Sequence, residues 1–182
     1  YVGVQIMCWT FIIQYGTRLF MAEGMAEQEA EVLSQKYNIV AMVIFCISRF
    51  VCTFMLRFIN PGMLLKILAI AGACFTMGVI FFQNIWGLYC LVAVSACMSL
   101  MFPTIYGIAL NKLGDDAKFG AAGLIMAILG GSVLPPLQAS IIDMHTVLGM
   151  PAVNVSFVLP FICFIVIIIY GHRSYARSKM LK

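Results

Sequence analysis

Charged residues are scarce in this chain. Only 10% of its 182 residues are Asp, Glu, Lys or Arg, against roughly 25% in soluble domains. Hydrophobic residues make up 63% of the chain, and the mean hydropathy is +1.04. A water-soluble protein of this length could not bury so much apolar surface. The composition therefore predicts an integral membrane protein.

The sequence also lacks the motifs of enzymes and metal sites. It contains no HExxH, GxSxG or Walker A motif, and no Gly-rich loop that opens a helix after a strand. Its seven cysteines lie inside apolar runs without CxxC spacing, and His145 and His172 have no partner at metal-ligand spacing. The net charge of +4 comes from basic residues at the ends of apolar runs, not from one basic stripe. We expect no enzyme activity, metal, cofactor or nucleic-acid partner.

Two further absences concern the ends and centres of the apolar runs. The chain has no initiator Met and opens at Tyr1 inside an apolar run, so we expect it to be part of a longer polypeptide. No Asp or Glu lies in the middle of any run.

Six long apolar runs follow one another along the chain. In lipid the backbone must satisfy its own hydrogen bonds, so only helices and closed barrels can span it. A barrel would show short alternating strands, whereas these runs are about 20 residues long, the length of a spanning helix. We predict an all-α fold with six transmembrane helices at about residues 1–20, 37–59, 63–82, 87–110, 119–142 and 152–170.

Basic residues alternate between the breaks and so predict the orientation of the spans. One side receives only Arg18 and Lys36, next to an acidic break, and the other side receives Arg57, Lys66, Lys112, Lys118, Arg173, Arg177, Lys179 and Lys182. The positive-inside rule places the second side, with both ends of the chain, in the cytoplasm. Trp86 and Tyr89 are expected in the aromatic belt at the opposite interface.

One arginine lies at a depth that lipid disfavours. Arg49 stands in the middle of the second span, eight residues before Arg57, and a charge there costs at least a few kcal/mol. We therefore expect Arg49 to face the bundle interior, either as a cavity or gating contact or as a link between helix ends. Arg57 flanks the turn at residues 60–62 and is expected to anchor the cytoplasmic edge.

The first span carries a polar and aromatic face. Gln5 and Trp9 are four residues apart and share one side of a helix, which Tyr1 extends by a turn. An amide offers a donor and an acceptor, and an indole offers a flat apolar ring, so the pair suits a sugar. The alternative is that Gln5 bonds a neighbouring helix.

The fourth and fifth spans carry signs of bending. Ser99, Phe102 and Tyr106 recur at three- and four-residue spacing, and Pro103 should bend the helix between them. Interrupted helices are common at transporter sites, so we take these three residues as candidate substrate contacts. Gly130, Gly131 and Pro135, which is followed by a second proline, should permit close packing and a kink. That segment then lines a cavity, packs tightly, or bends without a function.

The chain resembles the C-terminal half of a major facilitator superfamily transporter of the fucose permease group, the fucose–galactose–glucose:proton symporters. The resemblance lies in the stretches YVGVQIMCW at residues 1–9, SRF at 48–50, RF at 57–58, MS at 98–99, PTI at 103–105, LGDDAKFG at 113–120 and GG at 130–131, and in Pro135. It implies twelve helices in two halves around a central cavity, of which this chain supplies the seventh to the twelfth.

The resemblance also implies a function. It implies inward transport of L-fucose or a related hexose through a bacterial inner membrane, driven by a proton gradient through alternating access. The family's proton-linked carboxylates would lie in the N-terminal half. The group has Tyr before the Pro-Thr of the tenth helix, whereas this chain has Phe102, and Tyr106 could supply the hydroxyl instead.

Two other functions fit the same sequence. A carrier for a drug or an organic anion would need a cation in its cavity, and Arg49 is the one available within a span. A non-transporting six-helix scaffold is the second alternative.

Overall fold

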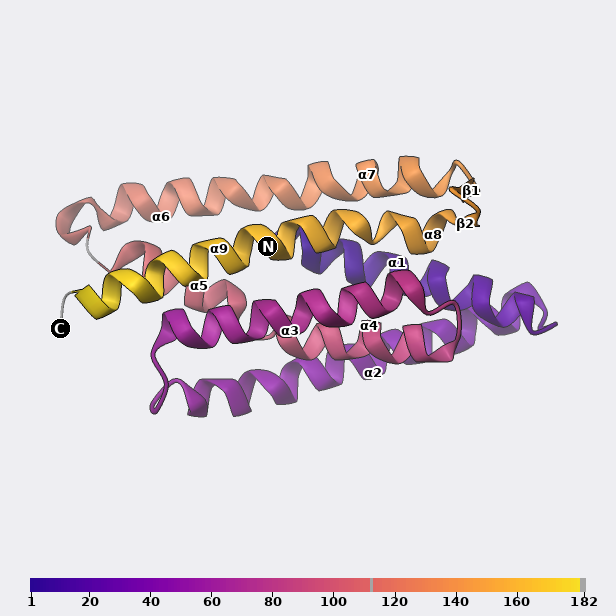
Figure 1. Cartoon of the computed structure of the whole chain (residues 1–182), viewed down its shortest axis with the longest axis horizontal. Helices are drawn as coiled ribbons and strands as arrows, with labels where there is room; N and C mark the ends of the chain where they lie inside the picture. Colours follow the sequence, from indigo (N-terminus) through magenta and orange to yellow (C-terminus); the bar gives the residue numbers. More distant parts are fainter. Residues whose placement is uncertain (112, 181–182) are drawn as a thin grey trace.

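The computed structural model describes residues 1–111 and 113–180, and most of them are helical. The helices are α1 (Val2–Ala22), α2 (Glu27–Met55), α3 (Pro61–Phe81), α4 (Ile85–Met98), α5 (Met101–Leu110), α6 (Ala117–Met126), α7 (Gly130–Ile142), α8 (Ala152–Ser156) and α9 (Val158–Met180). Two 3₁₀ turns, η1 (Gly114–Asp116) and η2 (Ala127–Leu129), flank α6. Strands β1 (Thr146–Val147) and β2 (Met150–Pro151) form a small antiparallel hairpin before α8. The long helices lie side by side along one axis (Figure 1).

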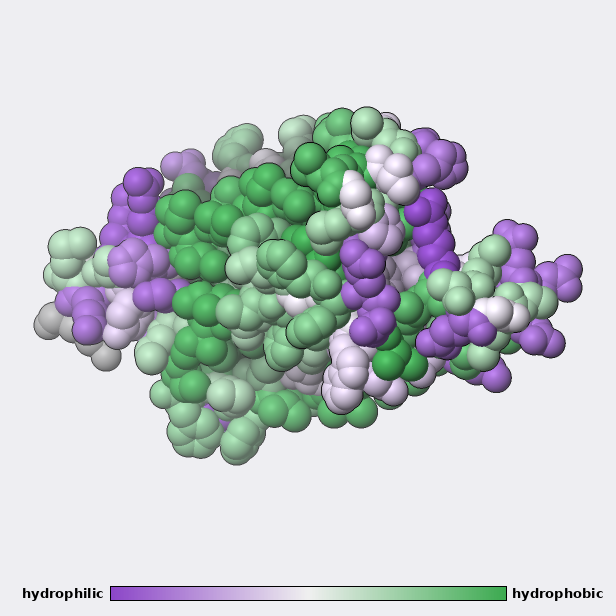
Figure 2. Space-filling view, turned by 45° about the vertical axis from the view of Figure 1, so that its right-hand side comes forward, coloured by the Kyte–Doolittle hydropathy of each residue, from purple (hydrophilic) through white to green (hydrophobic). Residues whose placement is uncertain are grey.

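The bundle has the length and surface of a membrane domain. Five segments are long and apolar enough to cross a membrane, namely Glu27–Met55, Pro61–Phe81, Ile85–Leu110, Gly114–Ile142 and Ala152–Met180. Figure 2 shows a hydrophobic band between hydrophilic ends. The predicted all-α membrane fold is therefore confirmed. The first predicted span forms α1, a helix of 21 residues that is not among the five, because Gln5, Gln14 and Arg18 lower its hydropathy.

The two ends of the bundle carry different charges. The α2–α3 turn, the start of α6 and the end of α9 lie at one end, and the α1–α2, α3–α4 and β1–β2 turns lie at the other (Figure 1). The first end, called the basic end below, carries Arg57, Lys66, Lys118, Arg173, Arg177 and Lys179. Lys112 and Lys182, which the sequence assigns to the same side, lie outside the described residues.

The second helix begins earlier than the sequence predicts. The acidic break expected before residue 37 is helical from Glu27, so α1 and α2 form a hairpin that protrudes from the bundle (Figure 1). Glu27 and Glu29 in the first turn stabilise the positive end of the helix dipole. Ser34 packs so closely on Gly16 that a Cβ there would lie 2.5 Å from the Ser34 Oγ. Contacts within the hairpin thus extend both helices beyond the apolar runs.

The last helix runs ten residues past its predicted end. α9 continues from Tyr170 to Met180 because its polar turns pack on the start of α3. The Asn60 side chain donates a hydrogen bond of 3.0 Å to the Ser178 Oγ. A Cβ on Gly171 would lie 3.2 Å from the Lys66 backbone nitrogen, so the two backbones approach closely here.

The fourth span is interrupted near its predicted bend. α4 ends at Met98 and α5 begins at Met101, with Pro103 in its first turn. Proline has no N–H to donate to the carbonyl four residues earlier, that of Ser99, which favours a break at this point. In the first turn of a new helix the missing N–H costs little.

The fifth span differs from the prediction. The sequence places its kink at Pro135 and the proline after it, yet both lie inside α7, which runs through them. The irregular turn is η2, just before Gly130. The two prolines withhold hydrogen bonds from the carbonyls of Gly131 and Ser132, and the tighter turn upstream takes up the change in helix geometry.

The core lies where α3 packs against α4 and α9, and where α1 packs against α2, α4 and α7. Phe164 of α9 lies against Gly72 of α3, where an added Cβ would come within 2.7 Å of the ring. The largest fully buried side chains include Met7, Leu65, Leu88, Phe157 and Phe164. This core holds α1 and α5, which carry the candidate site, in fixed positions.

Candidate functional site

The polar face of α1 carries an indole donor without a protein partner. Gln5 and Trp9 are both half-buried on this face, as their spacing predicts. The Trp9 ring meets Phe45 of α2 edge to face, with ring centroids 5.0 Å apart. The Trp9 Nε1 is buried and has no hydrogen-bond partner among residues 1–111 and 113–180. A buried N–H without a partner is costly, so Trp9 stays a candidate ligand contact.

Three aromatic rings connect α1 to α5. The Tyr1 hydroxyl donates a 2.6 Å hydrogen bond to the Met98 carbonyl at the end of α4. The ring centroids of Tyr1 and Phe102 lie 6.1 Å apart, and those of Phe102 and Tyr106 also lie 6.1 Å apart. Phe102 is 37% exposed. The row therefore presents aromatic surface on the same side of the bundle as the start of α1.

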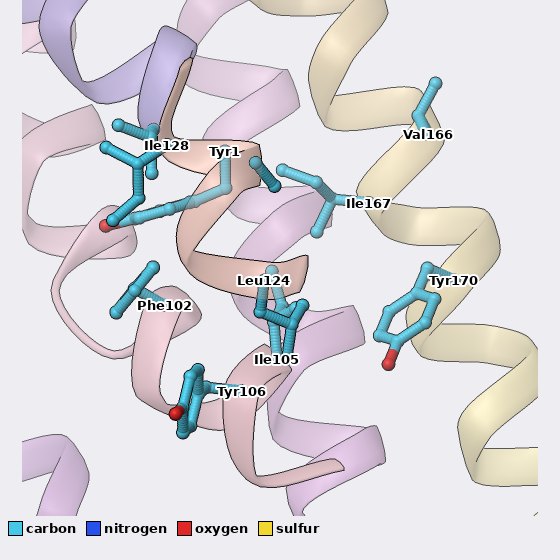
Figure 3. A pocket seen from close by; sticks show the side chains of 11 residues that line it. Tyr1, Phe102, Ile105, Tyr106, Leu124, Ile128, Val166, Ile167 and Tyr170 are labelled. Atoms are coloured by element: carbon cyan, nitrogen blue, oxygen red, sulfur yellow. The ribbon is translucent and has the colours of Figure 1, made fainter. Parts of the chain in front are cut away.

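A cavity of about 250 Å³ opens beside this row. Figure 3 shows its lining, which comes from α1, α5, α6, η2 and α9. Besides Tyr1, Phe102 and Tyr106, the lining consists of Val2, Ile105, Leu124, Ala127, Ile128, Val166, Ile167 and Tyr170. A sugar site needs several converging polar groups, and this lining offers only tyrosine hydroxyls. The apolar cavity alone is therefore a poor sugar site.

Ser99 lies apart from the other candidate substrate contacts. It is buried, and its hydroxyl donates a 3.2 Å hydrogen bond to the Ser48 Oγ on α2. Ser48 in turn donates to the Ala96 carbonyl at 3.0 Å. This short chain of hydrogen bonds joins α2 to α4. The fold thus brings Phe102 and Tyr106 to the cavity and places Ser99 in a helix contact.

Arg49 does not enter the packed core of the described bundle, and its expected place in the interior of a larger bundle stays a prediction. Arg49 is exposed on α2, one turn after Phe45, because α2 turns Ala41 and Cys52 toward the bundle instead. Arg49 forms no ion pair within the described part of the chain. Since a cation facing hydrocarbon is costly, water or additional protein must meet this side of α2. Arg57 lies exposed beyond the end of α2, at the basic end.

The two glycines of the fifth span differ in how closely other residues pack against them. Gly131 is buried against α1, and a Cβ there would lie 2.5 Å from the Ile6 Cδ1. Gly130 has open space around its Cα, and Pro135 is half-buried. Leu134 occupies the space beside Gly3 of α1. The α7 segment therefore packs tightly on α1, one of the outcomes that the sequence left open.

A buried polar cluster at the end opposite the basic one was not predicted. The Asn154 Nδ2 donates to the carbonyls of Val79 at 2.9 Å and Phe82 at 3.3 Å. The Tyr15 hydroxyl donates to the same Phe82 carbonyl at 2.6 Å. These bonds satisfy carbonyls at the end of α3 that have no helical partner. The sequence shows Asn154 at the start of an apolar run, where polarity is inexpensive, so it gave no sign of the partners.

Comparison with known proteins identifies the fold and its relatives. A search of protein-family models gave no match. The crystal structure of FucP, a major facilitator superfamily transporter in the outward conformation, superposes with a TM-score of 0.83 and 29% sequence identity over 96% of this chain and 39% of that one. The chain belongs to the major facilitator superfamily.

Relatives within the superfamily are sugar carriers. An L-fucose–proton symporter of Haemophilus influenzae is 53% identical over 182 residues, all of this chain and 40% of the relative. A glucose/galactose transporter of Brucella abortus is 27% identical over 94% of this chain and 39% of that protein. The chain thus spans about two fifths of the length of the curated relatives that it matches. The resemblance drawn from the sequence is confirmed.

Proposed function

We propose that this chain is the C-terminal six-helix half of a sugar:proton symporter and forms one wall of its sugar cavity. The identity of 53% with an L-fucose–proton symporter over the whole chain carries this proposal. L-Fucose or a related hexose is the proposed substrate, moved inward by alternating access and driven by a proton gradient, without a cofactor.

The proposed wall combines the donor-bearing face of α1 with the aromatic row of α5. Aromatic rings pack on the C–H faces of a sugar, while the Gln5 amide and the unpartnered Trp9 Nε1 supply hydrogen bonds to its hydroxyls. Phe102 offers a ring without a hydroxyl, and Tyr106 carries one 6.1 Å further along. No carboxylate lies in the middle of a span of this chain, which supports placing proton coupling in the N-terminal half.

An N-terminal half also accounts for the exposed Arg49. That partner would cover the side of α2 that carries Arg49 and enclose the cavity from the opposite side. The two halves of such carriers rock about a central site. The proposed location is a bacterial inner membrane with the basic end in the cytosol, as the positive-inside rule predicts.

The experiment is sugar uptake by the full-length carrier in sealed membrane vesicles, with and without an imposed proton gradient, against a panel of hexoses. We expect gradient-dependent uptake of L-fucose or a close relative. Uptake that does not depend on the proton gradient, or the absence of uptake for every hexose, would contradict the proposal.

A carrier for organic anions is the second candidate, and the unpaired exposed Arg49 favours it. Counterflow of labelled fucose against unlabelled hexoses and organic anions separates the two. Exchange with hexoses alone supports the sugar carrier, and exchange with anions alone supports the alternative. A non-transporting scaffold would show neither exchange.

A further inference from the structure

A second and larger cavity lies at the basic end of the bundle. Its volume is about 740 Å³, and it opens between the start of α3, the end of α5 and the last turns of α9. Its lining mixes polar and apolar side chains, namely Asn60, Pro61, Ile108, Ala109, Asn111, Tyr170, Ser174, Arg177, Ser178 and Met180. The proposed sugar wall uses none of these residues.

The two cavities lie next to each other along α9, and we treat them together as one groove. Tyr170 lines both of them. Val166 in the apolar cavity and Arg177 in the polar one lie eleven residues apart, or about 16 Å along a helix. α6 packs on α5 but makes little contact with α9. The apolar cavity reaches between α6 and α9, where Leu124 and Val166 line it (Figure 3), and it meets the polar cavity at Tyr170.

The charge at the polar end of the groove is positive. Arg177 lines the cavity, is exposed, and has no ion pair within residues 1–111 and 113–180. Among the described residues, no carboxylate lines the cavity. Asn60 and Ser178 are already hydrogen-bonded to each other, whereas Ser174 and Asn111 are not engaged within the described part of the chain. An anion at this position would meet one guanidinium and two neutral hydrogen-bonding side chains.

We propose that this groove binds an anionic glycerophospholipid of the leaflet at the basic end. The phosphate lies against Arg177, Ser174 and Asn111, and one acyl chain enters the apolar gap beside Leu124 and Val166. Basic pockets between transmembrane helices are suited to anionic headgroups. A free phosphate would use the polar cavity alone, whereas a phospholipid also uses the apolar space beside Leu124 and Val166.

The test is native mass spectrometry of the detergent-purified full-length carrier, titrated separately with phosphatidylglycerol, phosphatidylcholine and inorganic phosphate. We expect retention of phosphatidylglycerol in preference to phosphatidylcholine. Arg177→Gln should weaken that binding about fivefold, the effect of one basic residue on an anionic headgroup. Leu124→Trp, which fills the apolar gap, should weaken it as well.

Arg173→Gln is the matched control, because it removes the same charge one turn away on α9, outside the lining. We expect it to leave phosphatidylglycerol retention unchanged. Equal losses in the two arginine variants, equal retention of the two lipids, or displacement of the lipid by inorganic phosphate would each overturn the proposal. Arg177→Lys keeps the charge and should retain most of the binding. If Arg177→Lys binds the lipid and Arg177→Gln does not, the missing charge is the cause of the loss. If both variants lose binding, the side chain is needed for folding and the charge is not the cause. Sugar uptake plays no part in this readout, so the two proposals can fail independently.

Discussion

At the scale of the residue, the most informative group is the buried indole N–H of Trp9. The hydroxyl of Tyr15 and the amide of Asn154, by contrast, reach backbone carbonyls. Trp9 has no such partner in the described chain, although its ring is held firmly by Phe45. The contrast is the reason to test Trp9 as a ligand contact.

We predict that Trp9→Ala and Gln5→Ala in the full-length carrier weaken sugar uptake without preventing membrane insertion. The loss of one hydrogen bond to a neutral hydroxyl should raise the KM for sugar about fivefold. Gln14→Ala is the control, because Gln14 is exposed on another face of α1. Unchanged kinetics in both variants, with normal protein levels, would remove α1 from the sugar wall.

A second residue prediction concerns the cluster at the end of α3. Asn154→Ala leaves the Val79 carbonyl buried without its partner, so we expect a loss of stability of about 1–3 kcal/mol. Thermal unfolding of the purified carrier measures the loss. Ser140→Ala, which removes an exposed hydroxyl bonded to the Pro136 carbonyl, should cost much less. Similar melting temperatures for the two variants would contradict a stabilising role for Asn154.

The sequence predicted the shared face of Gln5 and Trp9, because helical spacing alone fixes it. It could not predict the direction of Arg49 or Ser99. Because burying a charge in lipid is costly, Arg49 is expected to avoid lipid. This cost does not determine whether its own bundle or another part of the protein covers it. The spacing of Ser99 is compatible both with a ligand-binding face and with a contact to Ser48, so spacing alone could not distinguish them.

At the scale of the element, α3 and α9 form the most extensive helix contact in the described part of the chain. Glycines on both helices allow the approach, with Gly72 facing Phe164 and Gly171 facing the Lys66 backbone. A side chain can move aside for a new methyl group, whereas a backbone nitrogen cannot. The contact at Gly171 is therefore the less tolerant of the two.

We predict that Gly171→Leu forces α9 away from α3 and destabilises the carrier by about 1–3 kcal/mol, the usual cost of overpacking. Gly123→Leu on α6 is the control, because nothing lies within 4 Å of its virtual Cβ. The apparent melting temperature should fall for the first variant alone. An equal fall in melting temperature for both variants would mean that leucine itself, and not the contact between Gly171 and α3, causes the effect.

Among the elements, the apolar runs predicted five of the six helical segments closely at one or both ends, because hydropathy changes sharply where lipid contact begins. They failed where polar residues continue a helix. Glu27 starts α2 and Met180 ends α9 because of contacts with Gly16 and Asn60, which lie in other helices. Pro103 signalled an interruption correctly because its missing N–H acts locally.

At the scale of the whole molecule, aromatic side chains and charges define where the bundle meets a membrane. Phe20, Tyr37, Tyr89 and Trp86 form a continuous aromatic contact at the end opposite the basic one. Tyrosine and tryptophan favour the interface between lipid and water. The acidic hairpin of α1 and α2 projects beyond this aromatic contact (Figure 1).

We predict that single cysteines introduced at Glu27 and Arg177 of the full-length carrier in intact cells differ in labelling by a membrane-impermeant maleimide. The Glu27 position should react at once, and the Arg177 position only after the membrane is permeabilised, because positive residues stay in the cytosol. The parent carrier, measured in parallel, gives the background, and this chain's own cysteines lie within the spans. The reverse pattern would invert the proposed orientation.

The uninterrupted last turns of α9 have a practical consequence for imaging. A carrier embedded in a detergent micelle offers few rigid landmarks for aligning particle images in electron microscopy. α9 remains helical to Met180, about ten residues past its apolar stretch, and is fastened to α3 by Asn60 and Ser178. A soluble helical protein spliced in register after Met180 would therefore share one continuous rod with the bundle and serve as a fiducial marker of known orientation.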